Sequence, residues 1–364
     1  MTLRAVSKER DAHTELVYTI CPVLVASHVA VVKGWLEKEL ARRGGTARYL
    51  WSLPSENWLS HFNHTLPNQI RDGGNIPAIH ARSKGRDTKL IGLTCAGDGG
   101  QILVRVDSAI HRVADLHGRR VGLYNRGKTD RVDFWRATAE RGILLALELA
   151  GLRQSDVEWV DVTVEGPDYP STAPVDTPAQ RFKFTDTGKN SLYGAEISAL
   201  LAGKVDAIYA GGSRAHQFHV SGKIKSIEDL RRYPDWTLQV ANSPYAITVS
   251  TEFATQHRDL VVAFLRAAIR AGRWVHEHRQ TATETFGQVL PQWGEVRLLK
   301  TELSRHKFVP NLAPRGLAGV EVQKRFLLER GYIDRDFDLA TWVDTSFLDE
   351  VNADLRKEQA VANL

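Results

Sequence analysis

Hydrophobic and polar positions along the first fifty residues change from a strand pattern to a helix pattern and back. Residues 16–26 form an alternating run that is rich in β-branched residues, which predicts a strand. Residues 29–40 repeat apolar side chains at helical spacing, and Gly44-Gly45 follows as a helix end. Residues 47–53 return to a strand pattern. The chain therefore opens with a strand–helix–strand unit.

The same alternation continues along most of the chain. Helical patterns cover 78–85, 130–152, 191–203 and 258–278, and strand patterns cover 88–95, 99–108, 119–124, 157–164, 204–210 and 236–250. From residue 280 onward the pattern is largely helical. Helices that alternate with strands predict an α/β fold with mostly parallel sheets.

One long segment does not fit either pattern. Residues 165–190 are rich in Pro, Thr and Asp. A connection of this length is uncommon in a compact domain unless it has a function. We expect a functional loop or a lid that closes over a ligand.

The composition is that of an ordinary globular protein, with 43% hydrophobic and 25% charged residues and a formal net charge of +5. The Lys and Arg residues are scattered, and no basic run with interleaved aromatic residues indicates nucleic-acid binding. A basic cleft that attracts a small anion agrees with the same charge. We expect a small-molecule partner and no nucleic acid.

The first sixteen residues lack the apolar core of a secretion signal, and no run approaches the length of a transmembrane helix. The two cysteines form no CxxC motif, which predicts reduced thiols in the cytoplasm. No cluster with metal-ligand spacing, glycine-rich phosphate loop or GxSxG elbow is present. The sequence therefore predicts a cytoplasmic protein with no membrane span, no metal and no cofactor, and indicates nothing about its oligomeric state.

Three segments in order carry a first resemblance. Residues 113–124, 200–211 and 258–278 resemble corresponding parts of periplasmic-binding-protein type II chains, particularly the nitrate, sulfonate and thiamine-precursor binders. The resemblance implies two Rossmann-like lobes with a helical C-terminal region, closing over a small anion. We expect residues 1–118 with 240–364 to form the first lobe and residues 119–239 to form the second. Because no export signal is visible, an enzyme or a regulator is expected rather than a transporter subunit.

A second resemblance is more specific. The sequences CPV at 21–23, HF at 61–62 and RDGGNIP at 71–77 together resemble the aryl sulfinate desulfinases. The resemblance implies a cofactor-free C–S bond hydrolase that releases sulfite. It also implies an active site that consists of Cys21, His61, Arg71, Gly73 and Gly74.

The residue types suit this chemistry. The planar guanidinium of Arg71 can hold two sulfinate oxygens, and Gly73 with Gly74 lets backbone amides approach the anion closely. Cys21 can protonate the ring carbon as a thiol or attack sulfur as a thiolate, and His61 can tune it. The sequence leaves both routes open, and we slightly favour the thiolate that attacks sulfur.

Each candidate also has a simpler interpretation. Cys21 could be a buried apolar residue, as we expect for Cys95, and Arg71 could form an ion pair with the adjacent Asp72. His64 could be an ordinary loop residue or a second polar contact to substrate.

The organic part of the substrate is expected to lie between the lobes. We predict that Phe62, His64, Tyr209 and Arg214 line its binding site. Residues 211–216 are more polar than this region of the desulfinases, which suggests a carboxylate-bearing or hydroxylated sulfinate.

Two other functions stay open. A non-catalytic cytoplasmic binding protein for a sulfonate or sulfinate would have the same architecture, but would not need a thiol beside the anion. A different enzyme on this scaffold, such as a decarboxylase or a pyrimidine-precursor synthase, is the third possibility.

Overall fold

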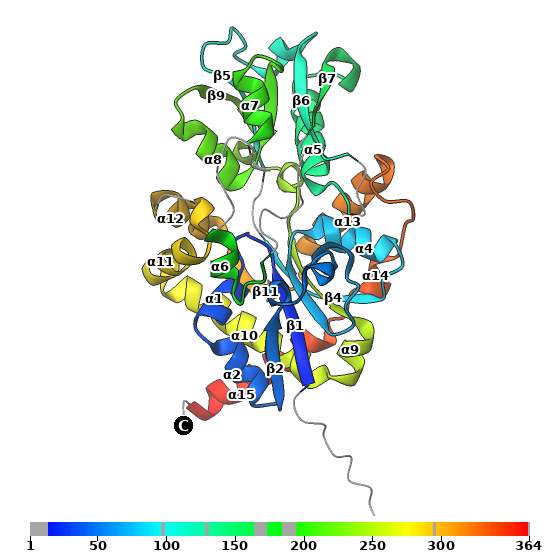
Figure 1. The fold of residues 1–364 in the computed structure, drawn as a ribbon, viewed down its shortest axis with the longest axis vertical. Helices are drawn as coiled ribbons and strands as arrows, with labels where there is room; N and C mark the ends of the chain where they lie inside the picture. Colours follow the sequence, from blue (N-terminus) through cyan, green and yellow to red (C-terminus); the bar gives the residue numbers. More distant parts are fainter. Residues whose placement is uncertain are drawn as a thin grey trace, which may run out of the picture.

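The computed structural model describes most of the chain, namely residues 14–95, 99–127, 131–163, 173–183, 194–293 and 296–362. Two α/β lobes lie one above the other along the long axis (Figure 1). Each lobe is built on one sheet, so the predicted α/β architecture with two lobes is confirmed.

The first lobe contains a six-stranded sheet in the order β11-β4-β10-β3-β1-β2. Its strands are β1 (Thr14–Ile20), β2 (Gly45–Tyr49), β3 (Gln69–Gly73), β4 (Thr88–Cys95), β10 (Tyr245–Ser250) and β11 (Lys307–Asn311). β1 runs parallel to both β2 and β3, so the carboxyl ends of β1 and β3 meet at one edge of the sheet.

The second lobe contains a five-stranded sheet in the order β7-β6-β8-β5-β9. Its strands are β5 (Gln101–Arg105), β6 (Arg120–Asn125), β7 (Glu158–Thr163), β8 (Ala207–Ala210) and β9 (Ile224–Asp229). In each sheet the strand that follows a crossing between the lobes, β5 or β10, pairs antiparallel with its neighbours. Both sheets are therefore mixed, but most strands of each run in one direction, as expected, and the exceptions are β5, β10 and β11.

The chain crosses between the lobes twice. The first crossing lies between the end of β4 at Cys95 and the start of β5 at Gln101, because β5 pairs with β8 and β9 of the second sheet. The strand pairing therefore assigns residues 101–118 to the second lobe, whereas the sequence suggested a boundary after residue 118. The return crossing lies between β9 and β10, in agreement with the boundary expected near residue 240.

Helices cover both faces of the first sheet (Figure 1). One face is covered by α1 (Ala26–Val32), α2 (Trp35–Ala41), α10 (Arg258–Glu277) and α11 (Arg279–Val289), with α15 (Ser346–Ala362) packed on α10. The other face is covered by α4 (Asn75–Ser83), α13 (Pro314–Glu329) and α14 (Leu339–Trp342). The remaining short helices of this lobe are α3 (Ser60–Asn63), α9 (Thr251–Gln256) and α12 (Val296–Arg305).

The helices of the second lobe are α5 (Phe134–Leu149), α7 (Ala195–Leu201) and α8 (Gly212–Val220). Single 3-10 turns lie at Leu50–Ser52, Ser55–Asn57, Val113–Leu116, Gln154–Asp156, Leu230–Arg232, Trp236–Gln239 and Pro291–Trp293. α5 belongs to both lobes by packing: Ile143 and Leu147 contact the second sheet, whereas Val132, just before the helix, and Ala137 join the core of the first lobe. α5 therefore contributes apolar side chains to a core cluster in each lobe.

Several local predictions are wrong. The helix expected over 29–40 is divided into α1 and α2, and the strands expected over 16–26 and 47–53 end at Ile20 and Tyr49. Residues 307–311 form β11 instead of continuing the helical region, and residues 236–239 form a 3-10 turn instead of a strand. β11 is an edge strand beside β4, and its short sequence around Pro310 has too few residues to show a period. Tertiary pairing alone makes it a strand.

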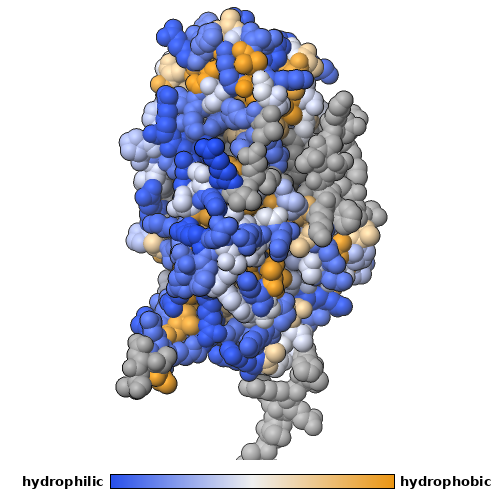
Figure 2. Space-filling model, turned by 90° about the vertical axis from the view of Figure 1, so that its left-hand side faces the viewer, coloured by the Kyte–Doolittle hydropathy of each residue, from blue (hydrophilic) through white to orange (hydrophobic). Residues whose placement is uncertain are grey.

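The surface agrees with the composition. The face shown in Figure 2 is mostly hydrophilic, with apolar side chains in small separate groups. Among the described residues, the large apolar side chains that are exposed are Val32, Val106, Leu149, Leu201 and Val361. None of the described helices combines the length and apolar character that a membrane span requires.

The close contact between α10 and β11 should make the stability of the protein sensitive to a side chain at Gly272. A Cβ atom on Gly272 would lie 2.6 Å from the backbone oxygen of Phe308, so no side chain fits. We expect Gly272→Ala to lower the free energy of unfolding by about 1–3 kcal/mol, measured by urea denaturation. Gly287→Ala in α11 is the matched control, because a Cβ atom there would meet only Leu299, at 3.7 Å. Alanine at this position should stabilise α11 by roughly 0.5–1 kcal/mol. Equal stability of the two variants would contradict the close packing at Gly272.

Candidate active site

Cys21 lies directly after β1, where it faces the end of β3. Its backbone N–H donates to the carbonyl of Asp72 at 2.9 Å, which continues the pairing of the two parallel strands. A Cβ atom on Gly73 would lie 2.2 Å from the Cys21 sulfur. Only glycine therefore permits the thiol to lie against β3.

His61 approaches Cys21 from the short helix α3. Its Nε2 lies 3.3 Å from the Cys21 sulfur, and its Nδ1 lies 2.7 Å from the Thr19 hydroxyl. Both His61 and Thr19 are buried. Since each ring nitrogen has a partner, the imidazole is held in one orientation toward the thiol.

Arg71 is fully buried on β3 and joins the parts of the site. Its Nη2 donates to the Cys21 sulfur at 3.2 Å, its Nε to the His61 carbonyl at 2.8 Å and its Nη1 to the Gly74 carbonyl at 2.8 Å. One side chain thus fixes the thiol, the histidine helix and the glycine pair together.

The charge of Arg71 is not balanced by an ion pair within the described part of the chain. The adjacent Asp72 points to the other face of β3, where it accepts a hydrogen bond from Ser27. The simpler interpretation, an Arg71–Asp72 ion pair, is therefore wrong. Because buried charges are normally paired, a buried arginine with only neutral acceptors favours an anionic ligand.

The thiol and the imidazole are both neutral near pH 7. Burial raises the pKa of the Cys21 thiol above its ordinary value, although Arg71 and a hydrogen bond from the Gly74 backbone act in the opposite direction. Burial, followed by the charges of Arg71 and Arg181, lowers the pKa of His61 well below its ordinary value. The site therefore holds a thiol–imidazole pair rather than a thiolate–imidazolium ion pair.

Aromatic side chains from both lobes meet beside His61. Phe62 makes an edge contact with His61 at 4.7 Å between ring centroids. Phe62 also stacks on Phe134 of α5, with 5.9 Å between the ring centroids and 19° between the ring planes. The Arg131 guanidinium lies 4.8 Å from the Phe62 centroid. Phe62 therefore packs between His61 and α5, and its contact with substrate stays a prediction.

His64 has a place in the framework of the first lobe. It ends α3 in the left-handed conformation, with φ of 52°, and its Nε2 lies 3.1 Å from the Thr248 hydroxyl of β10. Burial lowers the pKa of His64 to about 3. The ring is neutral and bound to Thr248, so its predicted contact with substrate gains no support here.

The structure does not bring Tyr209 or Arg214 to Cys21 through any described contact. Tyr209 is buried in β8, and its ring lies where side chains on Gly100 and Gly142 would be. Arg214 forms a buried ion pair with Glu196. Because its charge is balanced inside the second lobe, the predicted place of Arg214 in the lining of the substrate site gains no support from these contacts.

Part of the predicted lid lies outside the described residues, but residues 173–183 are described and contain α6 (Pro178–Lys183). The Val175 N–H donates to the Trp51 carbonyl at 2.9 Å, and the Arg181 guanidinium lies 3.3 Å from a Trp51 ring centroid. The ring centroid of Trp51 in turn lies 5.9 Å from that of His61. This segment therefore packs against the first lobe directly beside the histidine.

Sequence reasoning missed two contributors to the site. Thr19 precedes Cys21 by two residues, and strand alternation could have placed both on one side. Asn242, which contacts Gly74, comes from the return crossing and gives no local signal. Cys95, expected to be structural, ends β4, but its side chain is outside the described part.

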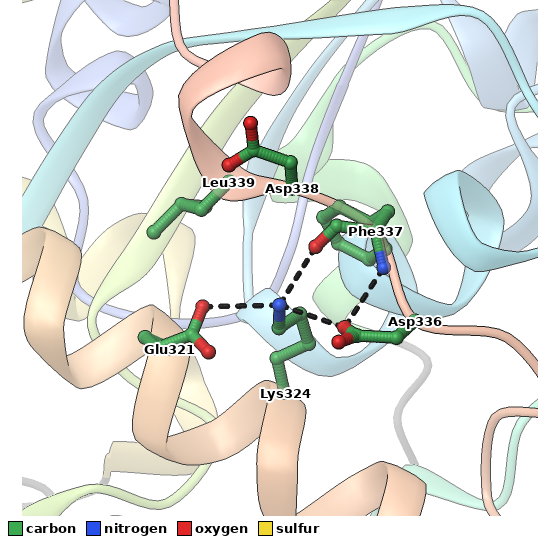
Figure 3. Close-up of a pocket in the computed structure, with 6 residues that line it drawn as sticks. All are labelled: Glu321, Lys324, Asp336, Phe337, Asp338 and Leu339. Carbon is green, nitrogen blue, oxygen red and sulfur yellow. Dashed lines mark hydrogen bonds and ion pairs between the residues drawn. The ribbon is translucent and has the colours of Figure 1, made fainter.

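A separate surface cavity of about 490 Å³ is formed by α13 and residues 336–339 (Figure 3). Although three carboxylates line it, the Lys324 ammonium binds Asp336, Glu321 and the Phe337 carbonyl. This lysine fixes the loop to α13, and the third carboxylate, Asp338, accepts a hydrogen bond from the Ala340 N–H. Across the described residues, no group of three or more His, Cys, Asp or Glu side chains is arranged to hold a metal ion.

Comparison with known proteins shows what the chain as a whole resembles. No family model matches the chain. Over 359 residues it is 28% identical to the 2'-hydroxybiphenyl-2-sulfinate desulfinase of Rhodococcus erythropolis, an alignment that covers 92% of each chain. The enzyme of Rhodococcus qingshengii matches equally well. This chain is similar to the 2'-hydroxybiphenyl-2-sulfinate desulfinases over almost its whole length.

Solved structures agree with this relationship. The desulfurization enzyme DSZB superimposes with a TM-score of 0.71 and 26% identity, covering 93% of this chain and 99% of the other. A cysteine-to-serine mutant of that enzyme, in complex with biphenyl-2-sulfinic acid, gives a TM-score of 0.69 at 24% identity, with the same coverage. The periplasmic aliphatic sulphonate binding protein SsuA of Escherichia coli shares the fold at 15% identity, with a TM-score of 0.61, covering 91% of this chain and 92% of the other. The expected desulfinase resemblance and the periplasmic-binding-protein type II architecture are confirmed.

The pKa of Cys21 can be tested by alkylation. We expect the iodoacetamide reaction of Cys21 to rise with a midpoint above the ordinary thiol pKa, because burial disfavours the thiolate. Mass spectrometry of the modified peptide separates Cys21 from Cys95, and Cys21→Ser gives the background. Arg71→Met should move the midpoint higher still, since it removes a cation. A midpoint near or below pH 7 would contradict the neutral pair.

Proposed function

We propose that this protein is a cofactor-free desulfinase that breaks the C–S bond of an aryl sulfinate and releases sulfite. The observation that carries the proposal is the Cys21 sulfur, which contacts both His61 and Arg71 inside a buried site. The relationship to the desulfinases over 92% of the chain supports it.

The anion site suits a sulfinate. Arg71 supplies the unbalanced positive charge beside the sulfur of Cys21, and the Gly74 backbone directs a hydrogen bond to the same place. A sulfinate bound there gives the buried cation its counter-ion and places the C–S bond next to the thiol. The stacked Phe62 and Phe134 rings offer an aromatic surface to the organic part.

The pKa directions favour Cys21 as a proton donor. The thiol proton passes to the ring carbon, the carbon keeps the electron pair of the C–S bond, and sulfur leaves as SO₂. Water then adds to SO₂ to give bisulfite and a proton, and this proton restores the thiol. The sum is one sulfinate and one water converted to one arene and one bisulfite, which is a hydrolysis.

Arg71 and Gly74 have a second role in this route. As the proton leaves, negative charge develops on the Cys21 sulfur, which lies 3.2 Å from Arg71 Nη2. A fixed cation and a backbone donor stabilise that charge without reorganisation. The alternative, attack of a Cys21 thiolate on sulfur, needs the thiolate before any step has occurred, and burial opposes its formation.

A binding protein without catalysis is the second candidate, because sulfonate binders share the architecture. A binder gains nothing from a thiol that is hydrogen-bonded to an imidazole at the anion site. The cytoplasmic location stays a prediction from sequence, and the natural substrate is defined here only as a sulfinate with an aromatic part.

Sulfite release tests the proposal. Purified protein should release sulfite from biphenyl-2-sulfinate or a related aryl sulfinate, measured with a thiol-independent sulfite assay. We expect Cys21→Ser to lower kcat at least about a hundredfold, because a serine hydroxyl is a far weaker proton donor. Cys95→Ser is the matched control and should keep its activity.

The outcomes separate the candidates. Binding of aryl sulfinates without sulfite release from any of them would favour the binding protein. Full sulfite release by Cys21→Ser would overturn the role of the thiol but not the reaction.

A further inference from the structure

Asn242 lies in the return crossing between the lobes and contacts the first turn of α4. Its backbone carbonyl accepts from the Asn75 N–H at 3.2 Å, and its side-chain Oδ1 accepts from the Ile76 N–H at 3.2 Å. Since a backbone N–H needs an acceptor, the Ile76 contact fixes which end of the amide is oxygen. The Nδ2 donor therefore occupies the other end.

The amide of Asn242 lies flat against Gly74. A Cβ atom on Gly74 would be 2.3 Å from Nδ2, which explains why this position is glycine. Asn242 is only partly buried, and among the described residues its Nδ2 has no hydrogen-bond partner. A neutral donor is thus available beside the glycine pair that borders Cys21.

Arg71 alone does not supply every donor that a sulfinate can use. Three of its five N–H groups already donate to His61, Gly74 and Cys21. A sulfinate carries two oxygens with several lone pairs, and it gains from a further donor on the Gly74 side of the site.

We propose that Asn242 is a substrate-binding residue whose Nδ2–H donates to a sulfinate oxygen held by Arg71. This inference rests on the proposed function, because it takes a sulfinate as the ligand. It assigns a binding contact to the return crossing, so that the segment that joins the lobes also touches the substrate.

Two variants separate this role from support of α4. Asn242→Ala removes both the donor and the Ile76 acceptor. Asn242→Asp keeps an oxygen for the Ile76 N–H and replaces the donor by a second carboxylate oxygen. A carboxylate also interacts favourably with the first turn of a helix, so the aspartate variant should fold at least as stably as the parent.

Binding is measured by calorimetry with biphenyl-2-sulfinate, in a Cys21→Ser background that prevents turnover. We expect Asn242→Ala to weaken binding about tenfold, which corresponds to about 1.4 kcal/mol. Asn242→Asp should weaken it more than alanine does, because its charge repels the sulfinate, while its melting temperature does not fall. When Cys21 is intact, both Asn242 variants should have a higher KM for the sulfinate, and their kcat should change less than about threefold.

Parental affinity in Asn242→Asp would overturn the inference and leave Asn242 as a support for α4. Loss of affinity in Asn242→Ala alone, together with a lower melting temperature, would have the same meaning. If the parent binds the sulfinate but the intact chain releases no sulfite, the proposed reaction fails while the binding series still decides the role of Asn242. If the Cys21→Ser parent binds neither biphenyl-2-sulfinate nor any related aryl sulfinate, both are overturned.

Discussion

The buried guanidinium of Arg71 is the interaction on which the site depends. It donates to the Cys21 sulfur, the His61 carbonyl and the Gly74 carbonyl, three groups on three different segments of the first lobe. None of these acceptors carries the full negative charge that a buried cation requires. The protein therefore holds a positive charge in place at the cost of stability, and an anionic ligand recovers that stability.

The neutral thiol follows from the same arrangement. Burial raises the pKa of Cys21 and lowers that of His61, so the proton stays on sulfur until the substrate arrives. When the proton leaves, the cation and the Gly74 backbone donor are already in position. In the proposed reaction, burial holds the reactive proton on Cys21, and Arg71 stabilises the charge that its loss creates.

The sequence predicted the parts of the site that have local or motif signals. Cys21, His61 and Arg71 meet as expected, and the collision between a Gly73 side chain and Cys21 gives the glycine a physical reason. Asn242 and β11 depend on contacts between segments far apart in the chain, which no periodicity reports. The ion pair of Arg214 with Glu196 also gives no local signal, because the two residues are 18 positions apart. The sequence therefore did not show that the charge of Arg214 is balanced.

The protonation state of His61 tests this account most directly. Nitrogen-15 chemical shifts of the histidine rings distinguish imidazole from imidazolium, and His61→Gln assigns the signal. The account predicts a neutral His61 ring at pH values from about 8 down to about 6, around the ordinary histidine pKa of about 6.5. An imidazolium at His61 near pH 7, paired with a Cys21 thiolate, would contradict it.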